Sequence, residues 1–243
     1  MSPNVLPNLI ALGLVAGLTV FATVRRPPAA LWPALRAYNL CALFTIAGYL
    51  MTDFLSPPWS EPVGVVMVYA GGLLTAALSW VIAVRYAEAQ DRPFPWARGP
   101  WVAGPVVIAA SLAVLAPFPI FWGLLSLPHL ADPSDPHWVW YAFAGAASLP
   151  AASSAVLYAN LAASSRDKIV RRNAAVMGGG LLLTLSLSIA VVASPDLVNI
   201  DPTVYGIAAT TVLFLYGSYR TRVFAVLSAA LRETILHDPD GVV

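Results

Sequence analysis

Seven long apolar runs dominate this chain of 243 residues and restrict what it can fold into. Six of them are 17 to 24 residues long, the length that a helix needs to cross a hydrocarbon layer of roughly 30 Å, and one has 15 residues. The runs are 5–24, 37–51, 62–84, 101–122, 138–161, 174–193 and 203–219, and the second has the weakest pattern. The sequence therefore predicts an all-α fold, a polytopic bundle of seven transmembrane helices.

The overall composition agrees with a membrane protein. Apolar residues make up 59% of the chain and charged residues 10%, with a mean hydropathy of +0.75. Soluble domains usually hold about 45–50% apolar residues. The lipid bilayer is therefore the expected surrounding of this chain. Its basic residues are divided among several connections rather than gathered on one surface, so no nucleic-acid partner is expected.

The positions of the basic residues predict the orientation in the membrane. They fall after the first, third, fifth and seventh runs, and the other connections contain none. Short basic segments are retained on the cytoplasmic side during insertion. We therefore expect a multi-pass protein of the plasma membrane, with its N-terminus outside and its C-terminus in the cytoplasm. The basic residues are Arg25, Arg26, Arg36, Arg85, Arg92, Arg98, Arg166, Lys168, Arg171, Arg172, Arg220, Arg222 and Arg232.

Residue patterns that carry chemistry are scarce. The only lysine, Lys168, lies in a connection, so the seventh run cannot hold retinal as a Schiff base. No phosphate-binding loop, zinc-protease motif or paired-cysteine spacing occurs. His129 and His137 share a segment with Asp132 and Asp135, a set that could bind a metal, but an ordinary exposed loop has the same composition. We expect no catalytic residue, no metal and no cofactor.

Aromatic and acidic residues near the expected outer ends of the helices are the candidates for a ligand site. Tryptophan and tyrosine favour the boundary of a membrane, where the ring is buried and its polar atom reaches water. The ligand-binding candidates are Trp59, Trp122, Trp138, Tyr141, Tyr205, Asp53, Asp196 and Asp201.

Two further patterns predict contacts within and around the bundle. Gly13 and Gly17 form a G-x-x-x-G, and 178–180 is a run of three glycines, so close helix packing within the chain is expected at both places. Trp80 lies near the cytoplasmic end of the third run and is expected to be a boundary anchor.

The C-terminal segment continues the helical pattern past the last apolar run. Four apolar residues recur there at intervals of three and four, which is typical of one face of a helix. This face and the basic residues before it comprise Arg220, Arg222, Phe224, Leu227, Leu231 and Ile235. Pro239 should end the helix, and Asp240 and Gly241 form a turn signal. An amphipathic tail that lies on the inner membrane surface is the alternative interpretation.

Several of these features together resemble a known family. They are the seven predicted helices, the basic connector 166–172 followed by Asn173 and a glycine-rich run, the 219–224 sequence Tyr-Arg-Thr-Arg-Val-Phe, and the exit through 238–243. The chain resembles, over essentially its whole length, the N-terminal seven-helix sensor region of bacterial and archaeal histidine kinases. In that family a segment of the Asp-Gly-Val-Val type opens a cytoplasmic PAS domain, followed by a kinase or a cyclic-dinucleotide synthase. No PAS core, phosphoacceptor histidine or ATP-binding motif occurs within these residues, which is a departure from the complete receptors.

The resemblance implies the sensor part of a two-component system. Residues 1–219 would form the transmembrane sensor domain, 220–237 a cytoplasmic signalling helix, and 238–243 the start of a PAS-like domain. The chain would then be either a segment of a longer receptor or a stand-alone relative, and no enzyme by itself. A signal would pass through the seventh helix to a cytoplasmic output domain or a partner kinase, with homodimer contacts along the C-terminal helix.

Two functions from other classes remain open at this level. The first is a small transporter or channel for an uncharged solute, with serines and threonines within the runs lining a passage. The odd number of helices and the lack of an evident inverted repeat count against it. The second is a membrane-embedded enzyme, which would need a cluster of reactive groups at one depth.

Overall fold

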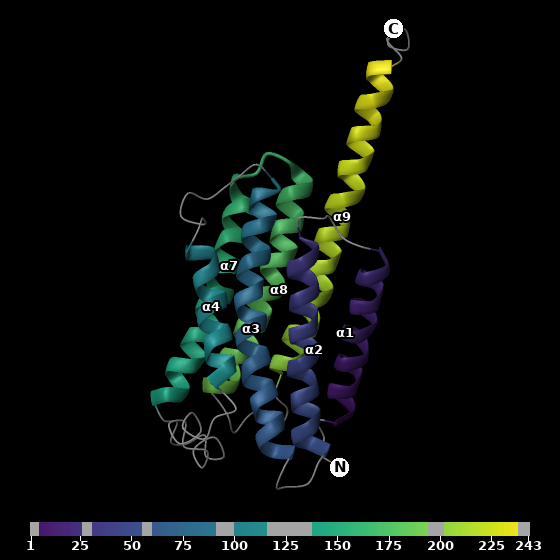
Figure 1. Cartoon of the computed structure of the whole chain (residues 1–243). Coiled ribbons are helices and arrows are strands. Elements are labelled where there is room, and N and C mark those ends of the chain that lie inside the picture. The colour runs from purple at the N-terminus through teal and green to yellow at the C-terminus, as the bar shows by residue number, and fades with distance from the viewer. Residues whose placement is uncertain are drawn as a thin grey trace.

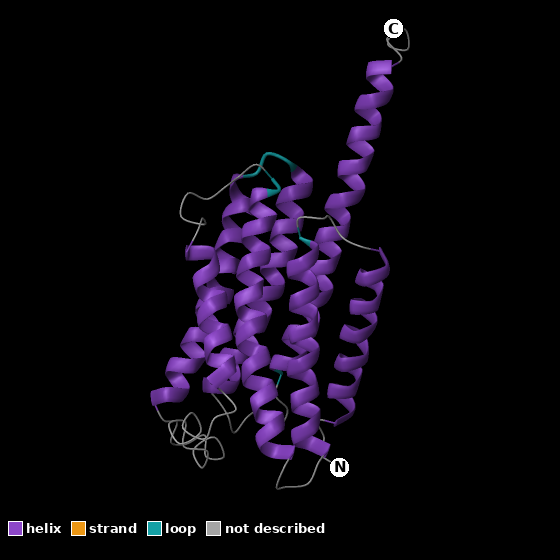
Figure 2. Cartoon of the chain, viewed as in Figure 1, coloured by secondary structure: helices purple, strands orange, loops and turns teal. Residues whose placement is uncertain are grey.

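The computed structural model describes residues 5–25, 31–54, 60–90, 100–115, 138–193 and 202–237. This described part is helical and contains no strand (Figure 2). Its helices are α1 (Val5–Arg25), α2 (Trp32–Phe54), α3 (Ser60–Glu88), α4 (Pro100–Leu115), α7 (Trp138–Ser164), α8 (Lys168–Ala193) and α9 (Thr203–His237). The prediction of an all-α fold with seven helices is confirmed for these residues.

Helix α8 extends beyond its apolar run because polar residues form its first turns. The backbone N–H of Ile169 donates to the Asp167 carboxylate at 2.7 Å, and the Arg171 N–H donates to the Asp167 carbonyl at 3.0 Å. Asp167 is therefore the N-cap of α8, and it satisfies an N–H group that the first turn leaves unpaired. As a result, α8 begins six residues before the apolar run that starts at Ala174.

Five helices form a ring, and two pack on its outside (Figure 1). Around the ring, α2 contacts α3, α3 contacts α7, α7 contacts α8, α8 contacts α9, and α9 contacts α2. Helix α1 packs against α2 and α9, whereas α4 packs against α3. The last helix is therefore in contact with α1, α2 and α8.

Large apolar side chains cover the outside of this bundle. Val24 is 75% exposed, Leu149 68% and Leu6 67%. Such a surface is unfavourable in water, at about 25 cal/mol per Å² of apolar area, but it matches hydrocarbon. Four helices are long and apolar enough to cross a membrane by length and composition: Val5–Val24, Trp32–Thr52, Val63–Glu88 and Lys168–Ala190.

The basic residues gather at one end of the bundle. Helices α1, α3 and α7 end there, α2, α4 and α8 begin there, and α9 leaves the bundle at the same end (Figure 1). Arg85, Arg171 and Arg172 are exposed at this end, and Arg85 forms an exposed ion pair with Glu88 at 3.0 Å. The charge segregation in the sequence thus becomes a charged face of the folded chain.

Two expectations about packing are wrong. Trp80 is only 4% exposed and is buried among apolar residues of the neighbouring helices, so it is no boundary anchor. A Cβ atom at Gly13 or Gly17 would meet no described atom within 4 Å, because these positions of α1 face away from its neighbours. Gly178 and Gly180 do mark close packing, against Tyr158 and Leu213.

Candidate functional site

Helix α9 connects the bundle to the region beyond it. It is one helix of 35 residues from Thr203 to His237. Its first half packs within the bundle, and its second half projects past the basic end (Figure 1). This helix therefore extends without a break from the packed bundle to the region beyond it.

The contact between α9 and α8 contains hydroxyl groups in its middle. Thr210 Oγ1 lies 2.8 Å from the Gly180 carbonyl oxygen and 2.7 Å from Thr184 Oγ1. Ser188 Oγ and Thr203 Oγ1 are 3.5 Å apart nearer the end where α9 begins. Where apolar side chains provide no net attraction between helices, hydrogen bonds of this kind stabilise the contact.

Glycines bring the same two helices close together. A Cβ atom placed on Gly206 would lie 2.8 Å from the Thr184 Cα atom. One placed on Gly217 would lie 2.7 Å from the sulfur of Met177. Small residues therefore allow the backbones of α8 and α9 to approach each other. We call this contact the α8–α9 seam; on α9 it comprises Thr203, Gly206, Thr210, Leu213 and Gly217.

The seam continues to the basic end through Asn173. This side chain is fully buried, and its Nδ2 donates to the Gly217 carbonyl oxygen over 3.5 Å, which is a long hydrogen bond. Asn173 follows directly after the basic residues that open α8. The charged end of α8 is thereby linked to α9 just before α9 leaves the bundle.

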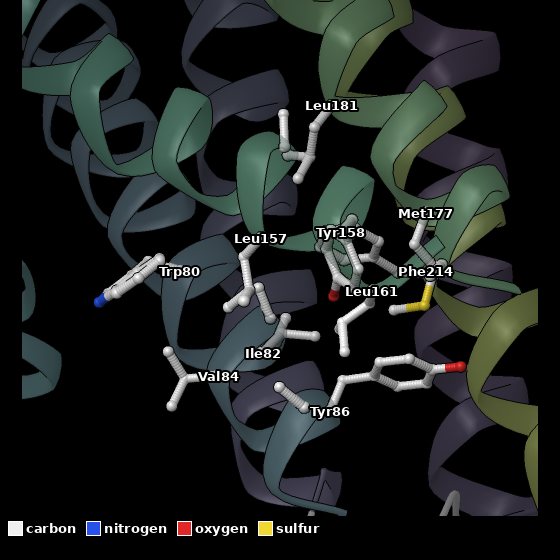
Figure 3. Close-up of a cluster of buried hydrophobic side chains, with 14 of the residues drawn as sticks. Trp80, Ile82, Val84, Tyr86, Leu157, Tyr158, Leu161, Met177, Leu181 and Phe214 are labelled. Atoms are coloured by element: carbon white, nitrogen blue, oxygen red, sulfur yellow. The ribbon is translucent and has the colours of Figure 1, made fainter. Parts of the chain in front are cut away.

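All five ring helices contribute large side chains to a buried cluster (Figure 3). The ring centroids of Tyr38 and Phe214 lie 5.2 Å apart, those of Tyr86 and Tyr158 5.9 Å, and those of Tyr158 and Phe214 6.1 Å. These are distances typical of interacting aromatic pairs. Met177 of α8 completes the set. Phe214 thus couples the position of α9 to α2 and α7.

Polar atoms in this cluster differ in how they are satisfied. The hydroxyl of Tyr38 is hydrogen-bonded to Thr211 of α9. The Tyr158 hydroxyl is fully buried and has no hydrogen-bond partner among the described residues. A buried hydroxyl without a partner is costly, at about 1–3 kcal/mol. A rearrangement of the helices that gave this hydroxyl a partner would therefore lower the free energy of the bundle.

The structure describes the side chain of only one ligand-binding candidate, so the predicted site is not tested. Tyr205 is half-buried in the first turn of α9. Asp53, Trp138 and Tyr141 belong to described helices, but their side chains are outside the described part. Trp59, Trp122, Asp196 and Asp201 lie outside the described residues altogether. The outer ligand site stays a prediction.

The residues predicted for the signalling helix all belong to α9. Arg220 lies 5.7 Å from the ring centroid of Tyr216, and its guanidinium donates to the Tyr216 hydroxyl. Arg222, Phe224, Leu227, Leu231 and Ile235 occupy helical positions, with side chains outside the described part. The helical state of 220–237 is therefore established.

The seam is the feature that the sequence did not reveal as a unit. Thr184, Ser188 and Thr210 stood out only as polar residues within apolar runs. Their partners were not predictable, because the order of helix packing follows from contacts between distant segments. The spacing of small and hydroxyl residues at 180, 184 and 188 in one run, and at 203, 206 and 210 in another, was the available signal.

A helical membrane bundle with a long terminal helix is the class of protein that these features define. The chain matches the family of the N-terminal 7TM region of histidine kinases over residues 8–227. It belongs to this family, and it is therefore a membrane sensor region, the non-catalytic part of such kinases. No curated protein and no solved structure matches the chain.

Proposed function

We propose that this chain senses a stimulus at the outer side of the plasma membrane and passes it through α9 to a cytoplasmic output module such as a histidine kinase. The main observation in support is the continuity of α9, which runs unbroken from Thr203 within the bundle to His237 beyond it. A continuous helix transmits a small displacement or rotation along its length. Membership of the histidine kinase 7TM family supports the same assignment.

The orientation of the proposed sensor follows from its charged face. The end from which α9 projects carries the exposed residues Arg85, Arg166, Arg171 and Arg172. Basic segments are retained in the cytoplasm during insertion. In this orientation the N-terminus is outside, and the part of α9 beyond residue 219 is a cytoplasmic signalling helix.

The output module is expected to work as a pair. The apolar positions of the extension recur at three and four residues, and such spacing favours association of two helices. We therefore include a homodimer formed along the signalling helix in the proposal. The stimulus would act at the opposite end of the bundle, where α2 ends at Phe54 next to Asp53 and α9 begins near Tyr205 (Figure 1). The other aromatic and acidic candidates are expected at the same end.

A chimera tests this function. Residues 1–237 are fused to the cytoplasmic part of a reporter histidine kinase, and autophosphorylation is measured in membranes. One residue inserted after Arg222 turns everything beyond it by about 100°, whereas a seven-residue heptad insertion leaves the facing nearly unchanged. The kinase output should change with the single insertion and be retained with the heptad. Equal output from both insertions would contradict transmission through α9.

A further inference from the structure

The apolar stripe beyond the bundle repeats the seam within it, shifted by two heptads. Thr210 and Phe224 are fourteen residues apart along α9, and so are Leu213 and Leu227. Gly217 and Leu231 have the same separation. Two heptads fall short of whole turns of an ideal α-helix by about 40°. The stripe positions therefore stay within about 40° of the direction in which α9 meets α8.

Helix α8 begins almost level with the start of this stripe. The two helices are antiparallel, with Gly180 beside Thr210 and Asn173 beside Gly217. Five residues before Asn173 is Lys168, the first residue of α8, which accordingly lies level with residue 222. Phe224 is thus the first stripe position beyond the N-terminal end of α8, and it lies on the side of α9 that α8 occupies.

This arrangement conflicts with pairing between two copies. In a parallel pair, the second extension would lie about 8–10 Å from the first along the stripe, and it would continue into its own membrane bundle. On the bundle side of Phe224, the position that the second α9 would need is filled by α8 of the first copy. The same conflict occurs in the second copy by symmetry. Neither α9 can therefore present its stripe to the other while both keep the seam as the structure has it.

We propose that α8 and the signalling helix of a second copy compete for one face of α9, so that the seam holds the sensor in an unpaired state and pairing requires α9 to turn on α8. This inference rests on the proposed function. The composition of the seam fits a contact that is made and broken. Glycines at 180, 206 and 217 provide little interlocking volume. The hydroxyl of Thr184 also lies 3.2 Å from the Gly180 carbonyl oxygen of its own helix, which is an alternative acceptor when the contact to Thr210 is lost.

A reversible lock across the seam tests the inference. In a Cys41→Ser background, Gly180→Cys and Leu213→Cys are combined. The ideal Cβ of Gly180 lies 3.4 Å from the Leu213 Cβ, close to the range of about 3.5–4.5 Å for a disulfide. A photo-crosslinking amino acid at Leu227 reports contact between copies in membranes. The reduced and oxidised forms of one preparation are compared.

A second lock serves as the matched control. Ser79→Cys with Ser154→Cys joins α3 to α7 and leaves α9 untouched. The hydroxyl oxygens of these two serines are 3.3 Å apart. Covalent dimers are expected with the seam reduced, and a loss of dimers when it is oxidised. The control lock should leave them unchanged. Monodispersity after detergent extraction confirms that each variant is folded.

The remaining outcomes separate this inference from the proposed function. Equal dimer yield from the oxidised and reduced seam would overturn the competition and leave the paired signalling helix intact. Absence of dimers in every form, the reduced ones included, would overturn the paired helix itself. Loss of dimers with both locks would show that any rigid bundle prevents pairing, which also contradicts a specific role for the seam.

Discussion

At the scale of single residues, the contact between α8 and α9 depends on side chains that are small rather than large. Thr184 packs directly against the backbone of Gly206, and Leu213 packs against Gly180. The Gly180 carbonyl oxygen also accepts a hydrogen bond from the Thr210 hydroxyl. Backbones this close gain many dispersion contacts, each of about 0.1–0.2 kcal/mol. An added methyl group is therefore expected to cost more here than at a glycine of α8 with open space around it, such as Gly179.

Alanine in place of a glycine should change the stability of the fold in opposite directions at a seam position and at a position outside the seam. In Gly206→Ala the new Cβ would lie 2.8 Å from the Thr184 Cα, so overpacking should destabilise the fold by about 1–3 kcal/mol. In Gly179→Ala the Cβ meets nothing described within 4 Å, and the better helix propensity should stabilise by up to about 1 kcal/mol. Thermal unfolding in detergent measures both. Equal changes in stability would contradict close packing of α8 against α9 at Gly206.

Two tyrosines of the buried cluster offer a matched pair. Tyr38→Phe removes a hydroxyl that is bonded to Thr211, which should cost about 0.5–1.5 kcal/mol. Tyr158→Phe removes a hydroxyl without a described partner and should be neutral or stabilising. The same unfolding measurement compares the two variants. A larger loss for Tyr158→Phe would mean that its hydroxyl is satisfied in the membrane.

At the scale of helices, local signals decide where each element begins. Asp167 caps α8 through its carboxylate and carries the basic residues after it into the first turns of the helix. This places the start of α8, and with it Asn173, level with the point where α9 leaves the bundle. The cap is therefore expected to matter for the position of α9 as well as for α8.

Removal of the cap gives a test at this scale. Asp167→Ala loses the hydrogen bond from the Ile169 N–H and should destabilise α8 by about 1 kcal/mol, whereas Asp167→Asn keeps a capping oxygen and should lose much less. Hydrogen exchange of amides in the first two turns of α8 reports the effect. Equal protection in all three proteins would show that tertiary packing alone holds this turn.

The existence and type of the helices could be predicted from the sequence, and their packing could not. Apolar length identified every run, including the weak one around Ala37, because the hydrophobic thickness of a membrane imposes it. Trp80 was misjudged because depth along a helix does not tell which face of that helix is covered. The pairing of Thr184 with Thr210 joins segments 26 residues apart and depends on the order of all the helices. No local pattern encodes that order.

At the scale of the whole molecule, one end is charged and the surface between the ends is apolar. Exposed arginines gather where α9 leaves, and the flanks expose leucine and valine. In the proposed orientation, the α9 extension lies in the cytoplasm and the opposite end outside, because basic segments are retained on the cytoplasmic side. Under the proposed function, a stimulus outside would have to reach the extension through the bundle, and the five-helix ring with its aromatic cluster is the path that we propose.

The orientation can be tested with single cysteines in a Cys41→Ser background. Ser164→Cys lies at the charged end and Val63→Cys at the opposite end, and both positions are exposed. A membrane-impermeant maleimide applied to intact cells should label position 63 and should reach position 164 only after permeabilisation. The reverse pattern would overturn the orientation and the direction of signalling.

The central claim, that α9 delivers the signal as a paired helix, is tested most directly by cysteine crosslinking in native membranes. Single cysteines are placed in turn at positions 222 to 236 in the Cys41→Ser background. Crosslinking should peak every three to four residues, at Phe224, Leu227 and Leu231, because these positions share one face of the helix. Uniform absence of crosslinks, with the segment labelled as if it lay on lipid, would contradict the account.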